Sequence, residues 1–121
     1  MQKILCVDDE PTQLMLLRLA LTRAHYQVIE ASNGQEGVDK AVEHKPDLII
    51  MDLMMPVMDG ATAVELIKKT TELAHIPVVV LSAYTHGGQA QRALDAGAVE
   101  LVSKSVILTE LIDTVQRNLS I

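Results

Sequence analysis

Two tyrosines are the only aromatic residues in the 121-residue sequence, since phenylalanine and tryptophan are absent. Proteins that bind single-stranded nucleic acids stack the bases on aromatic side chains, and this composition offers little for such a platform. Ten basic residues stand against sixteen acidic ones, which gives a net charge of −6. Because a nucleic-acid-binding protein normally presents a basic face, the composition argues against direct nucleic-acid binding.

Cysteine and long apolar runs are also scarce. Cys6 is the single cysteine, so the chain cannot form an internal disulfide, and a reducing, cytoplasmic setting fits. No apolar run approaches the ~20 residues that cross a bilayer, and the first residues lack the layout of a signal peptide. Apolar residues still make up 49% of the chain. We therefore expect one folded domain over residues 1–121, with no membrane association.

Five short apolar runs alternate with five segments of helical periodicity. The predicted strands are residues 4–7, 28–31, 48–51, 78–81 and 99–102. The run at 48–51 is apolar at every position, which is typical of a strand buried on both faces of a parallel sheet. A strand–helix order repeated five times indicates a parallel sheet covered by helices on both sides. We expect an α/β, doubly wound, five-stranded sheet with strand order 2-1-3-4-5 and five helices.

The intervening segments carry apolar residues at helical spacing, which predicts the faces that pack on the sheet. In chain order these residues are Leu14, Leu17 and Leu21; Val38, Ala41 and Val42; Ala63, Leu66 and Ile67; Ala90, Ala93 and Leu94; and Leu108, Leu111, Ile112, Val115 and Leu119. Asn33, with Glu36 three residues later, resembles a capping box at the start of the second helix. The third helix should begin near Asp59 or Gly60, and Gly97 should end the fourth.

Polar residues follow four of the predicted strands. They are Asp8 and Asp9 after the first strand, Asp52 at the end of the third, Ser82 after the fourth and Lys104 after the fifth. The carboxyl ends of parallel strands form one edge, where open α/β sheets bind ligands. Two carboxylates about 5 Å apart repel by roughly 3 kcal/mol at an effective dielectric constant of about 20. A cluster of such hard oxygen ligands suits Mg²⁺, which offsets the repulsion.

A simpler role is open to the acids after the first strand. Asp8, Asp9 and Glu10 precede a helix that begins near Pro11, and acidic residues interact favourably with the N-terminal end of a helix dipole. Because these acids lie on the same sheet edge as Asp52, we favour the interpretation that they belong to a functional site.

These segments together resemble the receiver domain of two-component response regulators. The matching segments are residues 7–11 (VDDEP), 47–56 (DLIIMDLMMP) and 58–60 (MDG), with Ser82-Ala83 and Lys104. The resemblance covers essentially the whole chain, in order and at the spacing of the family. It implies the CheY-like, flavodoxin-like fold and a phosphorylation-dependent signalling switch. The alternative is a pseudo-receiver, an interaction module that works without phosphorylation.

The resemblance also implies roles for individual residues. Asp52 would accept a phosphoryl group from the phosphohistidine of a histidine kinase. Mg²⁺ would be held by Asp9, Asp52 and the backbone carbonyl of Met54, with Asp8 acting through a water molecule. The metal would neutralise charge on the attacking carboxylate and on the phosphoryl oxygens.

On the same resemblance, Lys104, the Ser82 hydroxyl and the Ala83 backbone N–H would bind the phosphoryl oxygens. The chain would be no conventional enzyme but a phosphoacceptor that promotes its own phosphotransfer and dephosphorylation. Its partners would be a histidine kinase or phosphotransfer protein, and a downstream protein on the face of the fourth helix, fifth strand and fifth helix. No output domain is expected in this chain, so protein contacts would carry the signal.

Two positions depart from the family pattern. The family usually has a proline after the lysine, with a cis peptide bond, whereas here Ser105 follows Lys104. A cis bond without proline costs ~3–4 kcal/mol, so we expect a trans bond, a rearranged loop and a lysine farther from the phosphate. The usual aromatic switch residue is Leu101, which offers neither a hydroxyl nor a ring, and Tyr84 could partly substitute for it. Both departures favour the pseudo-receiver, whereas the presence of all the site residues argues for phosphorylation.

The first helix carries Met15, Leu16 and Leu19 besides its core stripe. Either this helix is buried on more than one face, or these residues form the surface that docks on the kinase helix bundle, as the resemblance implies.

Two other chemistries of this fold class match the sequence less well. A Mg²⁺-dependent phosphatase with an aspartyl nucleophile places nucleophile and acid two residues apart after the first strand, whereas here the acids lie on different strands. A flavodoxin needs a hydroxyl-rich phosphate loop after the first strand, where Asp8, Asp9 and Glu10 would repel the phosphate.

Overall fold

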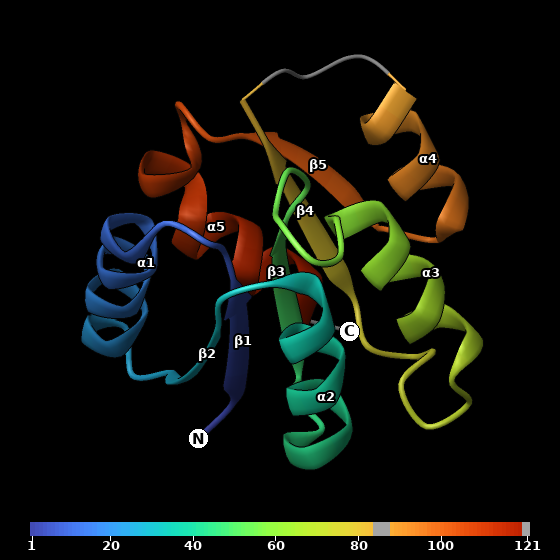
Figure 1. The fold of residues 1–121 in the computed structure, drawn as a ribbon. Coiled ribbons are helices and arrows are strands. Elements are labelled where there is room, and N and C mark those ends of the chain that lie inside the picture. The colour runs from blue at the N-terminus through green and yellow to red at the C-terminus, as the bar shows by residue number, and fades with distance from the viewer. Residues whose placement is uncertain (84–87, 120–121) are drawn as a thin grey trace.

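The computed structural model describes residues 1–83 and 88–119 and shows a parallel sheet with helices on both faces (Figure 1). In chain order the elements are β1 (Lys3–Val7), α1 (Pro11–Arg23), β2 (Gln27–Ala31), α2 (Gly34–His44), β3 (Leu48–Asp52), α3 (Gly60–Lys69), β4 (Val78–Ser82), α4 (Gly88–Ala96), β5 (Glu100–Ser103) and α5 (Ile107–Leu119). The strands lie in the order β2-β1-β3-β4-β5, and each neighbouring pair is parallel. The predicted fold class and strand order are confirmed. Tyr84, the predicted partial substitute for the aromatic switch residue, lies outside the described residues.

The sheet separates two apolar cores, because successive residues of a strand point to opposite faces. Leu5 and Val7 of β1 belong to the core under α2, α3 and α4. Ile4 and Cys6 belong to the core under α1 and α5, the two helices that lie on the left of the sheet in Figure 1. All residues of β3 and β4 are buried, as expected for strands covered on both faces.

The predicted faces of the helices are confirmed for most residues, which are buried or packed against one of the two cores. Four residues assigned to the core are exposed, namely Val42, Leu66, Leu94 and Leu108. On α2 the contact with β1 is made by Gly37, where a Cβ would lie 2.9 Å from Val7 Cγ2. On α5 the buried residue is Ile107, the neighbour of the predicted Leu108. The prediction was wrong at these four positions because an apolar residue at helical spacing can lie at the edge of the buried face, and close packing of helix on strand decides where that edge falls.

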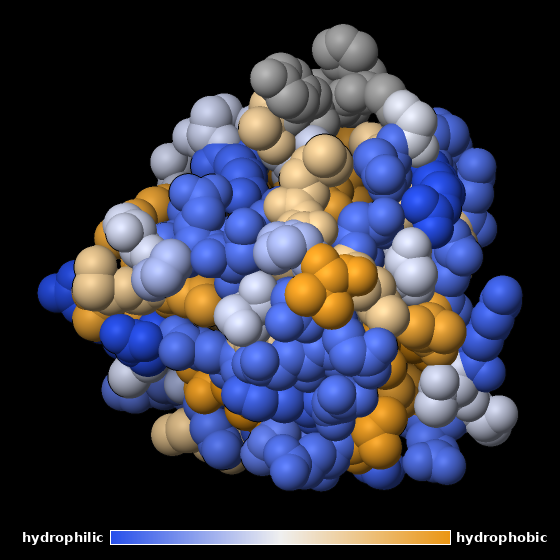
Figure 2. All heavy atoms as spheres, in the orientation of Figure 1, coloured by the Kyte–Doolittle hydropathy of each residue, from blue (hydrophilic) through white to orange (hydrophobic). Residues whose placement is uncertain are grey.

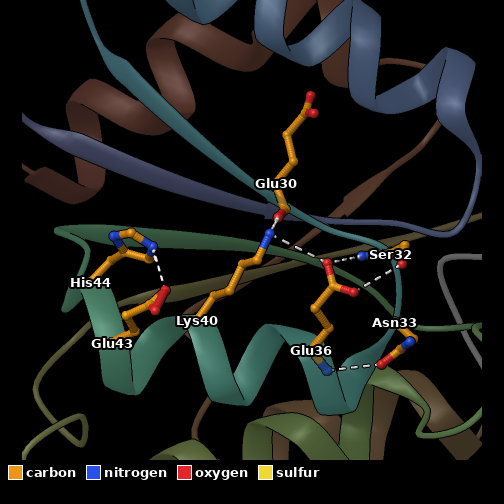
Figure 3. A network of polar contacts seen from close by, with 7 residues as sticks. All are labelled: Glu30, Ser32, Asn33, Glu36, Lys40, Glu43 and His44. Atoms are coloured by element: carbon orange, nitrogen blue, oxygen red, sulfur yellow. Dashed lines mark hydrogen bonds and ion pairs between the residues drawn. The ribbon is translucent and has the colours of Figure 1, made fainter.

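Helix α2 begins with a cap that matches the predicted capping box in part. The Asn33 side chain accepts a hydrogen bond of 2.8 Å from the Glu36 N–H. The Glu36 carboxylate, however, accepts from the backbone N–H of Ser32 at 3.2 Å, one residue before the cap. Lys40 donates to the Glu30 carbonyl at 2.5 Å and joins α2 to β2 (Figure 3). The outer face of α2 is covered mainly by hydrophilic side chains (Figure 2).

The loop between β3 and α3 is held against the strand by close backbone contacts. Asp59 caps α3, because its side chain accepts a hydrogen bond of 2.8 Å from the Thr62 N–H. Gly60, the first helical residue, donates its N–H to the Leu53 carbonyl at 2.9 Å. A Cβ at Gly60 would lie 2.2 Å from the Asp52 carbonyl oxygen, far inside van der Waals contact. Helix α3 therefore starts directly against the backbone of the last residue of β3.

We expect the substitution Gly60→Ala to lower the free energy of unfolding by about 1–3 kcal/mol, because the new methyl group meets backbone atoms that cannot move aside. Urea unfolding of the wild type and the variant measures this difference. Gly88→Ala is the matched control, since a Cβ there would meet no atom within 4 Å, and it should leave stability unchanged or raise it slightly. Equal losses in the two variants would contradict the proposed contact.

Candidate functional site

Three aspartates from two neighbouring strand ends lie together at the carboxyl edge of the sheet. Asp52 ends β3, and Asp8 and Asp9 follow β1, which pairs directly with β3. One carboxylate oxygen from each of the three lies within 4.8 Å of the others. The side chains of Asp8 and Asp52 are buried, and that of Asp9 is exposed. The predicted gathering of the three carboxylates is confirmed.

Lys104 reaches into this cluster from the end of β5. Its Nζ lies 3.1 Å from Asp52 Oδ2 and 3.3 Å from Asp8 Oδ2. It also lies 3.2 Å from Glu10 Oε1. The prediction of a lysine displaced from the site is therefore wrong, although the Lys104–Ser105 bond is trans as expected, since the described ranges contain no cis peptide.

Hydrogen bonds of the backbone and of two serine side chains explain how the loop after β5 keeps its shape without a proline after Lys104. The Lys104 N–H donates to the Ser82 carbonyl at 2.9 Å, which carries the β4–β5 pairing one residue past the end of β5. The Ser105 N–H donates to Ser103 Oγ at 3.3 Å, and the two hydroxyl oxygens lie 2.8 Å apart. This turn fixes the loop directly after Lys104 and keeps the Lys104 side chain directed at Asp52.

Burial and mutual repulsion set the protonation of the site. Burial, together with the charge of Asp8, raises the pKa of Asp52 to about 6, although Lys104 partly opposes the shift. Burial also raises the pKa of Asp8, against the hydrogen bond from the Glu10 N–H and the charge of Lys104. Burial lowers the pKa of Lys104, but its contacts with Asp52 and Asp8 outweigh this and raise the pKa overall. The single ammonium group thus compensates the carboxylates only in part.

A cavity of about 380 Å³ opens over the cluster, and its lining residues are Asp9, Glu10, Asp52, Met54, Ala83 and Lys104. Asp8 Oδ2 is buried and accepts no hydrogen bond from residues 1–83 or 88–119, with Lys104 Nζ at 3.3 Å as its charged neighbour. Clustered carboxylate oxygens are hard oxygen ligands of the kind that Mg²⁺ prefers. The residues present therefore fit a magnesium ion.

The remaining predicted residues lie around this cavity. Ala83 and Met54 line it, and the Met54 N–H donates a long hydrogen bond of 3.4 Å to Asp52 Oδ1. Ser82 is buried as the last residue of β4. Leu101 of β5 is half-buried and packs against the core under α4.

Glu10 also lines the cavity, whereas the sequence alone indicated no specific partner for it. It is the N-cap residue of α1, but in the described part of the chain its side chain makes no capping hydrogen bond. The carboxylate instead reaches Lys104, 94 positions away in sequence. No local pattern could have shown this contact, because it depends on how far apart β1 and β5 lie at the sheet edge.

The apolar residues Met15, Leu16 and Leu19 of α1 are exposed. The interpretation of α1 as a helix buried on more than one face is therefore wrong. No helix in the described ranges has the length and apolar character needed to cross a membrane.

Comparison with known proteins gives a consistent result. The family model described as response regulator receiver domain matches residues 4–116. The polar-differentiation response regulator DivK of Brucella anthropi is 31% identical over 115 residues, which cover 95% of this chain and 94% of that protein. The chemotaxis protein CheY4 of Vibrio cholerae has 31% identity and a TM-score of 0.90, over 97% of this chain and 98% of its own.

A further structural neighbour bears on the acidic cluster. The receiver domain of the sensor histidine kinase PA1611 from Pseudomonas aeruginosa PAO1 has 28% identity and a TM-score of 0.92, over 99% of this chain and 98% of its own. That structure has a magnesium ion coordinated in its active-site cleft.

The raised pKa of Asp52 predicts how stability depends on pH without metal. The pKa rises from the ordinary value of 3.8 to about 6 in the folded state, so the folded protein holds the proton more tightly than the unfolded chain. The wild type should lose stability relative to Asp52→Asn as pH rises from about 4 through about 6. Above that range Asp52→Asn should be more stable by about 2–3 kcal/mol.

Urea unfolding at pH 4 to 7.5 in the presence of EDTA measures this difference. Asp113→Asn, on the exposed side of α5, controls for the substitution itself. A difference between wild type and Asp52→Asn that stays constant with pH would contradict the burial argument.

Proposed function

The chain belongs to the family of response regulator receiver domains, which act as phosphorylation-dependent switches in two-component signalling, and we propose that Asp52 is its phosphoacceptor. The observation that carries this proposal is the position of the Asp52 carboxylate. It is buried at the end of β3, 3.1 Å from the Lys104 ammonium, and it lines the cavity. Lys104 has this contact despite the serine that follows it, so one of the two departures that favoured a pseudo-receiver loses its support.

The proposed reaction is phosphoryl transfer from a phosphohistidine to Asp52. A carboxylate oxygen of Asp52 forms a bond to phosphorus while the P–N bond breaks, and the electron pair stays on the imidazole nitrogen, which takes up a proton. Lys104 then pairs with a phosphoryl oxygen as a point charge. The Ser82 hydroxyl and the Ala83 N–H donate to the other phosphoryl oxygens, which distributes the new negative charge over three groups.

We propose that Asp9, Asp52 and the Met54 carbonyl hold Mg²⁺ and that Asp8 contributes through a water molecule. Support comes from the three carboxylates within 4.8 Å of one another and from Asp8 Oδ2, which accepts no hydrogen bond from the described residues. When bound, Mg²⁺ neutralises charge on the carboxylate and the phosphoryl oxygens. Asp8 meanwhile keeps its Oδ1 on the Glu10 N–H at 2.9 Å, which orients its other oxygen toward the cluster.

In this proposal the chain is a switch in the cytoplasm and not an enzyme with its own substrate. A histidine kinase or a phosphotransfer protein supplies the phosphoryl group, and a downstream protein binds the face of α4, β5 and α5. The phosphorylated Asp52 draws Ser82 inward and shifts the loop that leads to α4. Since Leu101 stands where the family has an aromatic residue, the shift passes through apolar packing against the core under α4.

Incubation with acetyl phosphate and Mg²⁺, followed by intact mass measurement, tests the phosphoacceptor. Wild type should gain one phosphoryl group, and Asp52→Asn or the addition of EDTA should abolish the gain. Asp95→Asn on the exposed face of α4 removes one carboxylate elsewhere and should behave like wild type. No gain in wild type would leave the pseudo-receiver as the better description, and a gain that persists in Asp52→Asn would place the acceptor on another residue.

The exposed apolar surface of α1 predicts a kinase-docking role. Substitution of Met15, Leu16 and Leu19 by glutamine should lower transfer from a histidine kinase that phosphorylates the wild type by about tenfold or more, because central apolar contacts dominate interface energies. Phosphorylation by acetyl phosphate should stay unchanged, which shows that the site is intact.

The matched control replaces three exposed apolar residues on the opposite face, Val42, Leu66 and Leu94, by glutamine. It should leave kinase transfer near the wild-type rate. Equal transfer rates in the two triple variants would exclude α1 as the docking surface.

A further inference from the structure

Glu10 lies at the mouth of the cavity and contacts the reactive end of Lys104. Its Oε1 accepts a hydrogen bond of 3.2 Å from Lys104 Nζ, and its side chain is 66% exposed. Its backbone serves the site as well, because the N–H donates to Asp8 Oδ1 at 2.9 Å. The side chain itself caps no helix in the described residues. Within the site, the side chain of Glu10 therefore contacts Lys104.

The Lys104 ammonium group has three N–H donors, and three carboxylates lie at nearly equal distances from it. The distances are 3.1 Å to Asp52, 3.2 Å to Glu10 and 3.3 Å to Asp8. In this arrangement three carboxylates surround the ammonium group, and the Glu10 carboxylate accepts a hydrogen bond from it. A phosphoryl oxygen that binds Lys104 must therefore compete with these carboxylates for its donors.

The burial of the three carboxylates decides which of them gives up its contact with Lys104 when a phosphoryl oxygen binds. Asp8 is buried and its other oxygen is held by the Glu10 N–H. Asp52 is buried and would itself carry the phosphoryl group. Glu10 is the exposed member of the three, and its side chain can turn into solvent without leaving an unpaired charge in the interior.

We propose that Glu10 is a positioning residue whose carboxylate occupies, in the unphosphorylated protein, the place on Lys104 that a phosphoryl oxygen takes. This inference rests on the proposed role of Asp52 and adds a regulatory element to the same site. Glu10 opposes anionic ligands in two ways, since it pairs with the lysine and adds a negative charge at the mouth of the cavity. An exposed ion pair is worth a factor of about two to five in an equilibrium constant, so the effect is a moderate brake on phosphorylation.

Two variants of Glu10 separate the lysine contact from the overall charge. Glu10→Gln removes the charge with little change in shape. Glu10→Asp keeps the charge, but its shorter side chain is a strong N-cap that turns toward the first N–H groups of α1, away from Lys104. The matched control is Glu72→Gln on the loop after α3, because Glu72 is 69% exposed and pairs with Lys45 at 3.7 Å.

Two measurements test the proposal. The first is the initial rate of phosphorylation by acetyl phosphate with Mg²⁺, followed by intact mass. The second is the Kd for inorganic phosphate with Mg²⁺, from NMR shifts of backbone amides at the cavity, which needs no phosphotransfer. Glu10→Gln and Glu10→Asp should both raise the rate and tighten phosphate binding by about two- to fivefold, and Glu72→Gln should match wild type.

The outcomes distinguish this inference from the proposed function. If the wild type takes no phosphoryl group, the proposed function fails, and phosphate affinity alone decides the role of Glu10. If the wild type is phosphorylated and neither Glu10 variant changes rate or affinity, the role of Glu10 is refuted while that of Asp52 stands. The proposal is also overturned if Glu72→Gln raises the rate and the affinity as much as Glu10→Gln does, or if Glu10→Asp raises neither. Either outcome would mean that the effect comes only from the overall charge of the protein.

Discussion

Lys104 compensates a cluster of carboxylates that the fold brings together at the carboxyl edge of the sheet. Asp8 and Asp52 come from neighbouring strands and are buried, so their repulsion is screened much less than between exposed charges. The ammonium group lies 3.1 Å from Asp52 and 3.3 Å from Asp8. Burial raises the pKa of both aspartates, and Lys104 opposes this shift only in part. The unbalanced charge favours a metal cation at the site, as in the proposed function, where Asp52 is the phosphoacceptor.

The loops that carry these groups are held mainly through backbone contacts. Helix α3 starts against the carbonyl of Asp52, where the absence of a side chain at Gly60 allows close approach. Gly34 at the start of α2 lies in the same way against the Met58 carbonyl and donates its N–H to it at 3.2 Å. On the other side, the Lys104 N–H extends the pairing with β4. Such contacts mean that the loops do not depend on the side chains of the site alone for their support.

The departures from the family pattern have different consequences in the structure. Ser105 is compensated locally, because its contacts with Ser103 close a turn where the family has proline. Leu101 has no such replacement among the described residues and is part of the apolar packing under α4. Lys104 thus keeps its contact with Asp52, whereas in the proposed function the route from the site to the α4–β5–α5 face would rely on apolar contacts.

The sequence by itself determined the strand order, the buried strands and the set of polar residues at the sheet edge. These features depend on local periodicity and on the position of a residue within its strand, both of which are written in the chain. Tertiary structure alone decided how far the buried faces of α3 and α5 extend, so that Leu66 and Leu108 lie outside them. It also decided the partners of Lys104, including Glu10. The reach of a long side chain depends on distances between strands remote in sequence, and the rotation of a helix depends on the shapes it packs against.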